Sequence, residues 1–263
     1  MTDFIRAKKS LGQNFLKDTH YLGKIVDAAR VDPGDKVLEI GPGLGDLTRL
    51  LAGRAARLLA LELDERLVPR LREEFRDAPS VEIVLADALE YPYEQLEGAW
   101  KVVANLPYYI STPLIQRLLA CRCVLTSMTL MLQKEVAERI AAPPGGREYG
   151  YLSVLVQLYA EPRIEFVVPR GAFSPRPKVD SAVISLAVRE KPAVPLRDDE
   201  FFFRVVKAAF SQRRKTLRNA LRQLDIPLSV MADLPAKTGI DLGRRAETLS
   251  VEEFFRLADF LQG

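Results

Sequence analysis

The residues best suited to chemistry stand in one short run, Asn105, Leu106, Pro107 and Tyr108. They follow a largely apolar stretch, residues 101–104, which predicts a buried strand. Pro107 must mark the exit from the sheet, because proline lacks a backbone N–H and cannot join a central ladder. A side-chain amide and an aromatic ring are therefore expected together on a loop at a strand end.

Such a loop could act on the exocyclic amine of adenine, which is a weak nucleophile because its lone pair is delocalised into the ring. If the Asn105 oxygen and a carbonyl of Leu106 or Pro107 accept the two N–H hydrogens, the lone pair turns towards an incoming methyl group. No general base of tuned pKa is then essential. Tyr108 would offer a stacking face worth about 1–3 kcal/mol, which helps to offset the cost of extruding a base.

A glycine-rich turn, with Gly41, Gly43 and Gly45, lies between a predicted strand and a predicted helix in VLEIGPGLGDLT. Glycine permits a tight turn there and lets a ligand approach the backbone closely. A dinucleotide fingerprint would place its third glycine at position 46, which is Asp46, so the spacing disfavours a dehydrogenase. A plain strand-to-helix turn, with the glycines serving packing alone, is the alternative.

Two acidic residues at later strand ends favour a ligand-binding turn over a plain strand-to-helix turn. Glu62 lies 21 residues after Gly41, and Asp87 follows the strand VEIVLA. Ligands of open α/β sheets bind at the carboxyl ends of strands, where Glu62 could accept the hydroxyl hydrogens of a ribose and Asp87 those of an adenine amino group. Either acid alone could simply cap a helix. Together with the glycine turn, and without a phosphate-binding lysine, they predict an adenosine site that suits S-adenosylmethionine.

Composition narrows the class of protein further. The 263 residues carry a net charge of +3 and include two cysteines and one histidine. His20 alone cannot supply Ser-His-Asp or two-histidine metal chemistry, and Cys121 and Cys123 are too few for zinc, so we expect core thiols and no metal. The start MTDFIRAKKS lacks the apolar core of a signal peptide, and no apolar run reaches the roughly 20 residues of a membrane span. We therefore expect a cytoplasmic protein.

Short apolar runs that alternate with amphipathic stretches predict βαβ units and a parallel sheet with helices on both faces. The expected strands are KVLEI, LLALEL, VEIVLAD, KVVAN, SMTLMLQ, RIEFVVP and SAVISLAV. The proline-interrupted segment REKPAVPLRDDE indicates a domain boundary. Beyond it only helices are expected, in FFFRVVKAAF, KTLRNALRQL and VEEFFRLADFL, the last with a Ser250 and Glu253 capping box.

Asn-Leu-Pro-Tyr after the fourth strand resembles the catalytic motif of adenine-N6 methyltransferases. Over essentially the whole chain, the sequence is similar to the ribosomal RNA adenine dimethyltransferase family. The resemblance implies a Rossmann-like class I methyltransferase fold, α/β with a mostly parallel seven-stranded sheet, over residues 1–188, and a small all-α RNA-binding domain over residues 189–263. The matching segments, in order, are KKSLGQNFL, EIGPGLGDLT, LELD, ADAL, NLPYYISTPLI, MLQKEVAERI, FSPRPKVDSAV and AFSQRRKTLRNAL.

The resemblance also implies roles for individual residues. Phe173 matches the aromatic that stacks on the target base opposite Tyr108, although it could simply anchor its loop. Tyr109 stands where many relatives carry asparagine, so its own role stays open. The implied methyl-donor contacts are Asn14, Leu16, Gly41, Gly43, Glu62, Asp87 and Asn105, and the implied catalytic residues are Asn105, Leu106, Pro107, Tyr108 and Phe173.

Positive charge is concentrated in residues 201–225, which contain seven Lys or Arg and one acid. Such a run is usually a solvated face, but the resemblance implies phosphate contacts, which confer affinity more than sequence choice. RNA shape and a splayed loop adenosine would then supply selectivity. Lys8 and Lys9 could extend this surface. The expected RNA-binding residues are Lys207, Arg213, Arg214, Lys215 and Arg218.

The reaction that the resemblance implies converts two adjacent adenosines, in a hairpin loop near the 3′ end of small-subunit (16S) rRNA, to N6,N6-dimethyladenosine, coupled to small-subunit assembly. We expect a monomeric enzyme that uses S-adenosylmethionine and acts on this RNA or on the 30S pre-ribosomal particle. PKVDSAVI and AFSQRRKTLRNAL favour it over a large-subunit rRNA adenine methylase of the macrolide-resistance type. A non-catalytic ribosome assembly factor is the other alternative, and intact Asn105 and Glu62 argue against it.

Overall fold

The computed structural model describes residues 7–8, 11–212 and 214–263, and the chain forms two compact units. The first unit contains the chain up to Ala137 together with Pro162–Val188, and the second contains Glu138–Glu161 and Arg189–Gly263. The segment Glu138–Glu161, which the sequence assigns to the first domain, is therefore part of the second unit.

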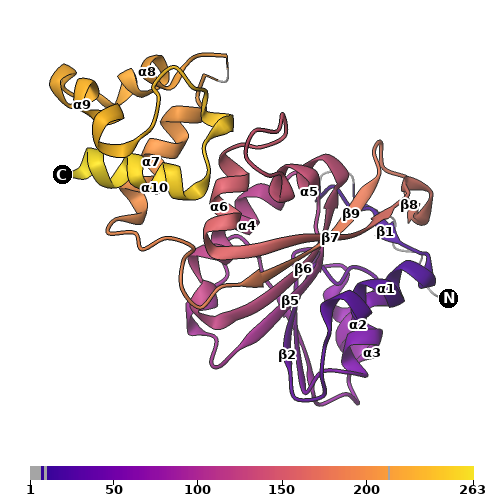
Figure 1. The fold of residues 1–263 in the computed structure, drawn as a ribbon. Helices are drawn as coiled ribbons and strands as arrows, with labels where there is room; N and C mark the ends of the chain where they lie inside the picture. Colours follow the sequence, from indigo (N-terminus) through magenta and orange to yellow (C-terminus); the bar gives the residue numbers. More distant parts are fainter. Residues whose placement is uncertain (1–6, 9–10, 213) are drawn as a thin grey trace. The chain divides into compact units, whose positions relative to one another are not determined.

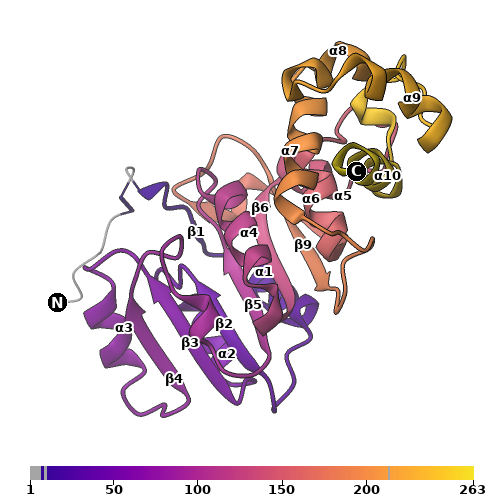
Figure 2. The same ribbon diagram turned by 90° about the vertical axis from the view of Figure 1, so that its left-hand side faces the viewer.

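A seven-stranded sheet organises the first unit, in the order β4-β3-β2-β5-β6-β9-β7 (Figures 1 and 2). The first five strands of that order pair in parallel, and β9 runs antiparallel to β6. This confirms the predicted α/β fold with a mostly parallel seven-stranded sheet. The strands are β2 (Lys36–Ile40), β3 (Arg57–Glu62), β4 (Val81–Leu85), β5 (Trp100–Asn105), β6 (Leu125–Gln133), β7 (Ala160–Val168) and β9 (Ser181–Val188).

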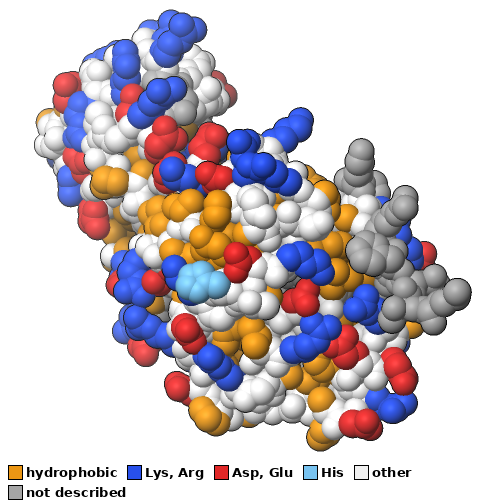
Figure 3. All heavy atoms as spheres, turned by 90° about the vertical axis from the view of Figure 1, so that its right-hand side faces the viewer, with side chains coloured by type: hydrophobic (Ala, Val, Ile, Leu, Met, Phe, Trp, Pro, Cys, Tyr) orange, Lys and Arg blue, Asp and Glu red, His pale blue; other side chains and the backbone are white. Residues whose placement is uncertain are grey.

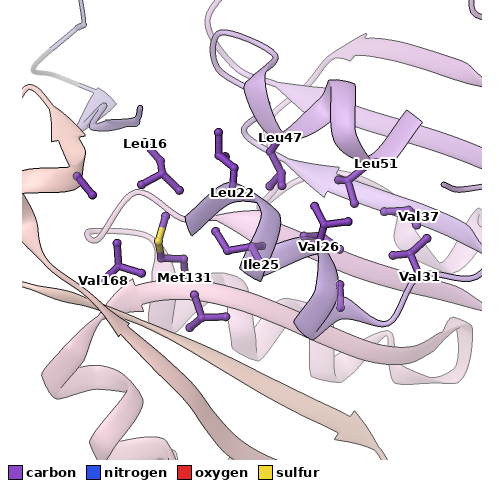
Figure 4. Packing of buried hydrophobic residues seen from close by; sticks show 14 of the residues in the cluster. Leu16, Leu22, Ile25, Val26, Val31, Val37, Leu47, Leu51, Met131 and Val168 are labelled. Atoms are coloured by element: carbon purple, nitrogen blue, oxygen red, sulfur yellow. The ribbon is translucent and has the colours of Figure 1, made fainter. Parts of the chain in front are cut away.

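Helices cover both faces of this sheet, which is why its central strands are apolar at consecutive positions. α1 begins after Asp18, whose side chain accepts a hydrogen bond from the backbone of His20. Its apolar side chains recur with helical spacing and pack with those of α2 against the sheet (Figure 4). α4 lies on the opposite face (Figure 1). The helices of this unit are α1 (Thr19–Ala29), α2 (Asp46–Ala52), α3 (Val68–Glu74) and α4 (Ser111–Ala120). α5 (Lys134–Ala141) begins in this unit and ends in the second.

Two very short strands, β1 (Phe15–Leu16) and β8 (Phe173–Ser174), form a separate antiparallel pair. Leu16 lies opposite Phe173, so the start of the described chain is joined to the loop that precedes β9. Strands of two residues leave no alternating pattern, and the sequence analysis did not predict them.

The second unit is helical, and the described residues from Arg189 onward contain no strand. The capping box of α10 is confirmed, because Glu253 N donates to Ser250 Oγ over 3.2 Å and Ser250 N donates to Glu253 Oε2 over 3.0 Å. KTLRNALRQL forms a shorter α-helix than expected and continues as a 3-10 turn, and α9, which contains Pro235, was not predicted. The helices are α6 (Tyr151–Tyr159), α7 (Asp199–Phe210), α8 (Leu217–Ala220), α9 (Leu228–Thr238) and α10 (Val251–Gln262).

Short 3-10 turns complete the described elements, and one of them corrects an expectation about the cysteines. Cys121 is buried, but Cys123 is exposed, because it lies in a 3-10 turn that leads into β6. The prediction of a core thiol is therefore wrong for Cys123. The turns are η2 (Tyr93–Gln95), η3 (Arg122–Val124), η4 (Arg170–Ala172), η5 (Leu221–Leu224) and η6 (Ala246–Thr248).

The surface carries both signs of charge. On the face drawn in Figure 3, basic and acidic side chains are interspersed, and the histidine is visible in pale blue. His20 is exposed, with its ring edge-on to Tyr21 at a centroid distance of 5.3 Å. Within the described residues, no helix is both long and apolar enough to cross a membrane.

Candidate active site

A cavity lies at the carboxyl ends of the central parallel strands in the first unit. The chain runs from β2 outward to β3 and β4 and then returns to β5 on the other side of β2. This reversal of strand order is the place where open α/β sheets bind ligands. The residues of both predicted sets line the cavity, namely Asn14, Leu16, Gly41, Gly43, Glu62, Asp87, Asn105, Leu106, Pro107, Tyr108 and Phe173.

The glycine turn after β2 has a backbone that favours glycine. Gly41 and Gly43 have φ angles of 72° and 60°, in the left-handed region that residues with a Cβ rarely adopt. A Cβ on Gly43 would also lie 3.1 Å from the Phe15 ring. The turn therefore brings bare backbone to the cavity, and packing against Phe15 fixes it.

Glu62 ends β3 and is buried, with 5% of its surface exposed. Its Oε2 accepts a hydrogen bond from Gly43 N over 3.0 Å, and its Oε1 accepts one from Asp64 N over 2.8 Å. Burial raises the pKa of Glu62, and these backbone N–H groups partly offset the rise. Because each carboxylate oxygen has two lone pairs, Glu62 can still accept hydrogens from a ligand.

Asp87 follows β4 and is exposed at the edge of the same cavity. Its Oδ1 accepts from Leu89 N over 2.8 Å, a local turn bond of the kind that aspartate often forms. The other carboxyl oxygen takes part in no hydrogen bond within the described chain. Asp87 therefore closes a local turn rather than capping a helix, and within the described chain its second oxygen remains available as an acceptor.

The N-terminal segment around Asn14 is fixed by a local hydrogen bond and by a hydrogen bond to a residue far along the chain. Asn14 Nδ2 donates to Gly12 O over 3.1 Å, and Gln13 Nε2 donates to Asp64 Oδ2 over 2.9 Å. Hydrogen bonding to Arg66 and Gln13 holds the pKa of Asp64 below its usual value. Gln13 and Asp64 were not predicted as site residues, although Asp64 directly follows the predicted strand LLALEL, because only the folded chain pairs these two side chains across 51 residues.

In the loop after β5, the carbonyl oxygens of Leu106 and Pro107 differ in their hydrogen bonding. Pro107 O already accepts from Ile110 N over 3.2 Å, and Leu106 N donates to Met131 O over 3.0 Å. Leu106 O accepts no hydrogen bond from any described residue. Of the two carbonyls considered from the sequence, the Leu106 carbonyl is thus the available acceptor beside Asn105.

Two aromatic rings line the cavity near this loop. The hydroxyl groups of Tyr108 and Ser181 share a hydrogen bond of 2.8 Å, and burial raises the pKa of Tyr108, so its phenol stays neutral. Phe173 is buried, with 6% of its surface exposed, and its strand partner is Leu16. Tyr109 is 57% exposed and packs over Gly12, whose Cβ position lies 3.1 Å from the tyrosine ring.

One acid that sequence analysis missed, Glu39, also lines the cavity. It lies within β2 and is 1% exposed. A charged residue inside the apolar run KVLEI was the available signal. Strand patterning alone could not show that its side chain borders the ligand cavity.

The basic residues predicted to bind RNA lie in the second unit. Lys207 is in the last turn of α7, Arg214 and Lys215 follow that helix, and Arg218 is in α8. All four are exposed, and within the described part of the chain none forms an ion pair. Their charge is thus uncompensated and open to a polyanion. Arg213 and Lys9 lie outside the described residues, and Lys8 is exposed.

Comparison with known proteins gives a consistent set of relatives. The model of the family "Ribosomal RNA adenine dimethylase" matches residues 5–263. A ribosomal RNA small subunit methyltransferase A from Geobacter metallireducens is 52% identical over 261 residues, covering 97% of this chain and 95% of the relative. One from Moorella thermoacetica is 48% identical, covering 97% and 92%.

Two solved structures share the fold over nearly the whole chain. A dimethyladenosine transferase from Plasmodium falciparum has a TM-score of 0.78 and 26% identity, covering 92% of this chain and 95% of the other. The 23S rRNA methyltransferase ErmE has a TM-score of 0.74 and 29% identity, covering 95% and 100%.

Proposed function

This chain belongs to the ribosomal RNA adenine dimethylase family, and we propose that it dimethylates two adjacent adenosines in a hairpin loop near the 3′ end of small-subunit rRNA. The methyl donor is S-adenosylmethionine, and the product is N6,N6-dimethyladenosine. The observation that carries the proposal is the unused Leu106 carbonyl beside Asn105, in a cavity that also contains Glu62 and two aromatic rings.

The chemistry of the cavity lining fits this donor. Among the described residues that line it, four are acids and none is Lys, Arg or His; the acids are Glu39, Asp46, Glu62 and Asp87. Asp46 pairs with Arg49, and burial keeps Glu39 neutral at pH 7, so Glu62 and Asp87 provide the negative charge of the lining. This charge disfavours the phosphates of a dinucleotide or a nucleoside triphosphate and attracts a cation. S-adenosylmethionine is an adenosine derivative with a cationic sulfonium, and when bound it supplies an electrophilic methyl carbon.

Glu62 and Asp87 have acceptors free for the adenosine part of this donor. Glu62 is held by two backbone N–H groups at the end of β3, so its carboxylate has a fixed orientation towards ribose hydroxyl groups. Asp87 at the end of β4 offers its second oxygen to the adenine amino group. Asn14 and Leu16 close the same cavity from the N-terminal segment.

The target adenine is positioned by the loop after β5. In the first transfer, Asn105 Oδ1 and Leu106 O would accept the two amino hydrogens and direct the nitrogen lone pair towards the methyl carbon. In the second transfer, the one remaining hydrogen would be accepted by one of these two oxygens. With the donor bound, a C–N bond would form as the C–S bond of the sulfonium breaks, and the methylated nitrogen would lose one proton to solvent. Tyr108 and Phe173 hold the extruded base by stacking, which offsets part of the cost of unstacking it.

The relatives favour the small subunit as the target. Those named small subunit methyltransferases are 52% and 48% identical, whereas the 23S rRNA methyltransferase is 29% identical. Exposed basic residues of the second unit, which form no ion pair within the described chain, supply phosphate contacts on this RNA, and a 30S precursor particle is the proposed partner.

A transfer assay with two substrates tests the proposal. The purified protein is incubated with S-adenosylmethionine carrying a labelled methyl group and, in parallel, with unmethylated small or large ribosomal subunits. We expect label in adenosine of the small-subunit RNA alone. Label in large-subunit RNA would support the macrolide-resistance type of enzyme instead, and no transfer to either would support a non-catalytic assembly factor.

A further inference from the structure

Glu39 is a buried acid that the proposed methyl transfer does not use. It lies in β2 between Ala60 of β3 and Val103 of β5, its strand partners, and only 1% of its surface is exposed. Neither carboxyl oxygen accepts a well-formed hydrogen bond within the described chain. Its side chain nevertheless lines the donor cavity.

A carboxylate with no partner and no solvent is costly, because burial removes the water that stabilises its charge. The groups that face Glu39 provide little compensation: Thr48 of α2 offers a hydroxyl group, and Glu62 of β3 adds a second negative charge. The remaining acids of the lining are Asp46 and Asp87, and no basic residue is among its described members. Burial raises the pKa of Glu39 to about 8, so the neutral acid dominates at pH 7.

We propose that Glu39 is a positioning residue that receives the cationic part of the methyl donor and releases its proton to solvent when that cation binds. The proposal rests on the proposed use of S-adenosylmethionine in this cavity. A cation beside Glu39 supplies the missing partner for the carboxylate, so ionisation becomes favourable only in the complex. The balance is one proton lost per cation bound, with no covalent bond made or broken. Up to about pH 7, where the amino group of the donor is also mostly protonated, donor affinity should therefore rise with pH.

Titration calorimetry in buffers of different ionisation enthalpy measures this proton directly and does not depend on catalysis. With a free pKa of about 8, binding of S-adenosylmethionine should release about 0.9 proton at pH 7, where the amino group of the donor is itself mostly protonated. 5′-Methylthioadenosine, which has neither a sulfonium nor an ammonium group, should bind with no release attributable to Glu39.

S-adenosylhomocysteine identifies which cation Glu39 receives. It retains the ammonium group of the donor and lacks the sulfonium. Release equal to that of the donor would assign Glu39 to the ammonium group, and release with the donor alone would assign it to the sulfonium. Either result supports the proposal.

The variant Glu39→Gln keeps the side-chain shape and removes the proton. It should release no proton with any of the three ligands, bind 5′-methylthioadenosine like the native protein and bind S-adenosylmethionine at least tenfold more weakly at pH 8. Glu82→Gln on the exposed edge of β4 is the matched control and should behave like the native protein. Thermal unfolding of both variants establishes that they are folded.

Donor binding without proton release in the native protein, or release that persists in Glu39→Gln, would overturn the role of Glu39 and leave the proposed function standing. Release that persists would identify Glu62 as the titrating group, because the pKa of Glu62 is also raised by burial. Failure of S-adenosylmethionine to bind at all would instead contradict the proposed function.

Discussion

Asn105 Nδ2 donates a hydrogen bond to the backbone oxygen of Asn14 over 3.3 Å, across 91 residues of sequence. This contact uses the donor end of the amide and leaves Asn105 Oδ1 as the end available to accept. It also joins the loop after β5 to the N-terminal segment, so one side chain connects the proposed base site to the proposed donor site.

Replacing Asn105 with alanine should lower turnover by on the order of a hundredfold or more, because an oriented acceptor for the amino hydrogens is lost. The affinity for S-adenosylmethionine should change much less than turnover. Rapid-quench kinetics and calorimetry separate the two effects. Gln116→Ala, which removes an exposed amide on α4, is the control and should leave both quantities unchanged. Normal turnover of Asn105→Ala would remove Asn105 from the mechanism.

Replacing Tyr108 tests stacking apart from hydrogen bonding. Tyr108→Phe loses only the 2.8 Å contact with Ser181 and should keep near-native RNA affinity and turnover. Tyr108→Ala also loses the ring, which should weaken RNA binding by roughly ten- to a hundredfold if stacking is worth about 1–3 kcal/mol. Equal losses in the two variants would show that the hydroxyl group, and not the ring, is what matters.

Replacing Glu62 with glutamine should weaken donor binding by about tenfold or more, because charge-assisted hydrogen bonds contribute roughly 1.5–3 kcal/mol each. The new NH₂ group would also face Gly43 N or Asp64 N, which are both donors. Calorimetric titration with S-adenosylmethionine measures the loss. Glu65→Gln, at an exposed position nearby, should bind the donor normally. An unaffected Glu62→Gln would leave Glu62 with a purely structural role.

Replacing Arg214, Lys215 and Arg218 together with glutamine should weaken RNA binding and reduce the salt dependence of log K by about 2, at ~0.7 per phosphate contact. Binding is measured over a range of salt concentrations. An equal change of net charge at Arg54, Arg57 and Arg76, which are exposed on the first unit, serves as the control. If both triple variants show the same slope, general charge rather than this cluster governs RNA binding.

The stability of the ligand-free protein should depend on the pH through Glu39. Burial raises the pKa of Glu39 to about 8, above its value in the unfolded chain, so the folded state holds the proton more tightly. The contribution to stability is therefore fully present at low pH and is lost as the pH rises towards 8. In urea unfolding, the free energy of unfolding of Glu39→Gln relative to that of the native protein should increase by on the order of 3 kcal/mol between pH 5 and pH 8. A constant difference across this range would mean that Glu39 titrates normally.

Much of the fold could be predicted from the sequence, because most strands follow local patterns of apolar residues and prolines. Buried parallel strands such as KVLEI are apolar at consecutive positions, and Pro107 marks where β5 ends. Patterns of this kind say nothing about the order of strands, or about β9 running antiparallel. α9 was missed because Pro235 lies inside it, where a proline usually indicates the end of a helix.

The candidate site, like the fold, could be predicted from the sequence only in part. Gly41, Glu62 and Asn105 could be predicted, because strand ends in an open sheet converge on one edge. The contacts that fix them could not, since Gln13 with Asp64 and Asn105 with Asn14 are separated by 51 and 91 residues. The role of Glu39 depends on burial, which becomes visible only when both faces of β2 are covered.

The most direct test of the proposed function is to map methylated nucleotides, by mass spectrometry, on small-subunit rRNA that has reacted with the protein and S-adenosylmethionine. We predict two methyl groups on N6 of each of two neighbouring adenosines in a hairpin loop near the 3′ end. Both products should form more slowly with Asn105→Ala, by on the order of a hundredfold or more. Methylation at another atom or another site, or its complete absence from an unmethylated particle, would contradict the proposed function.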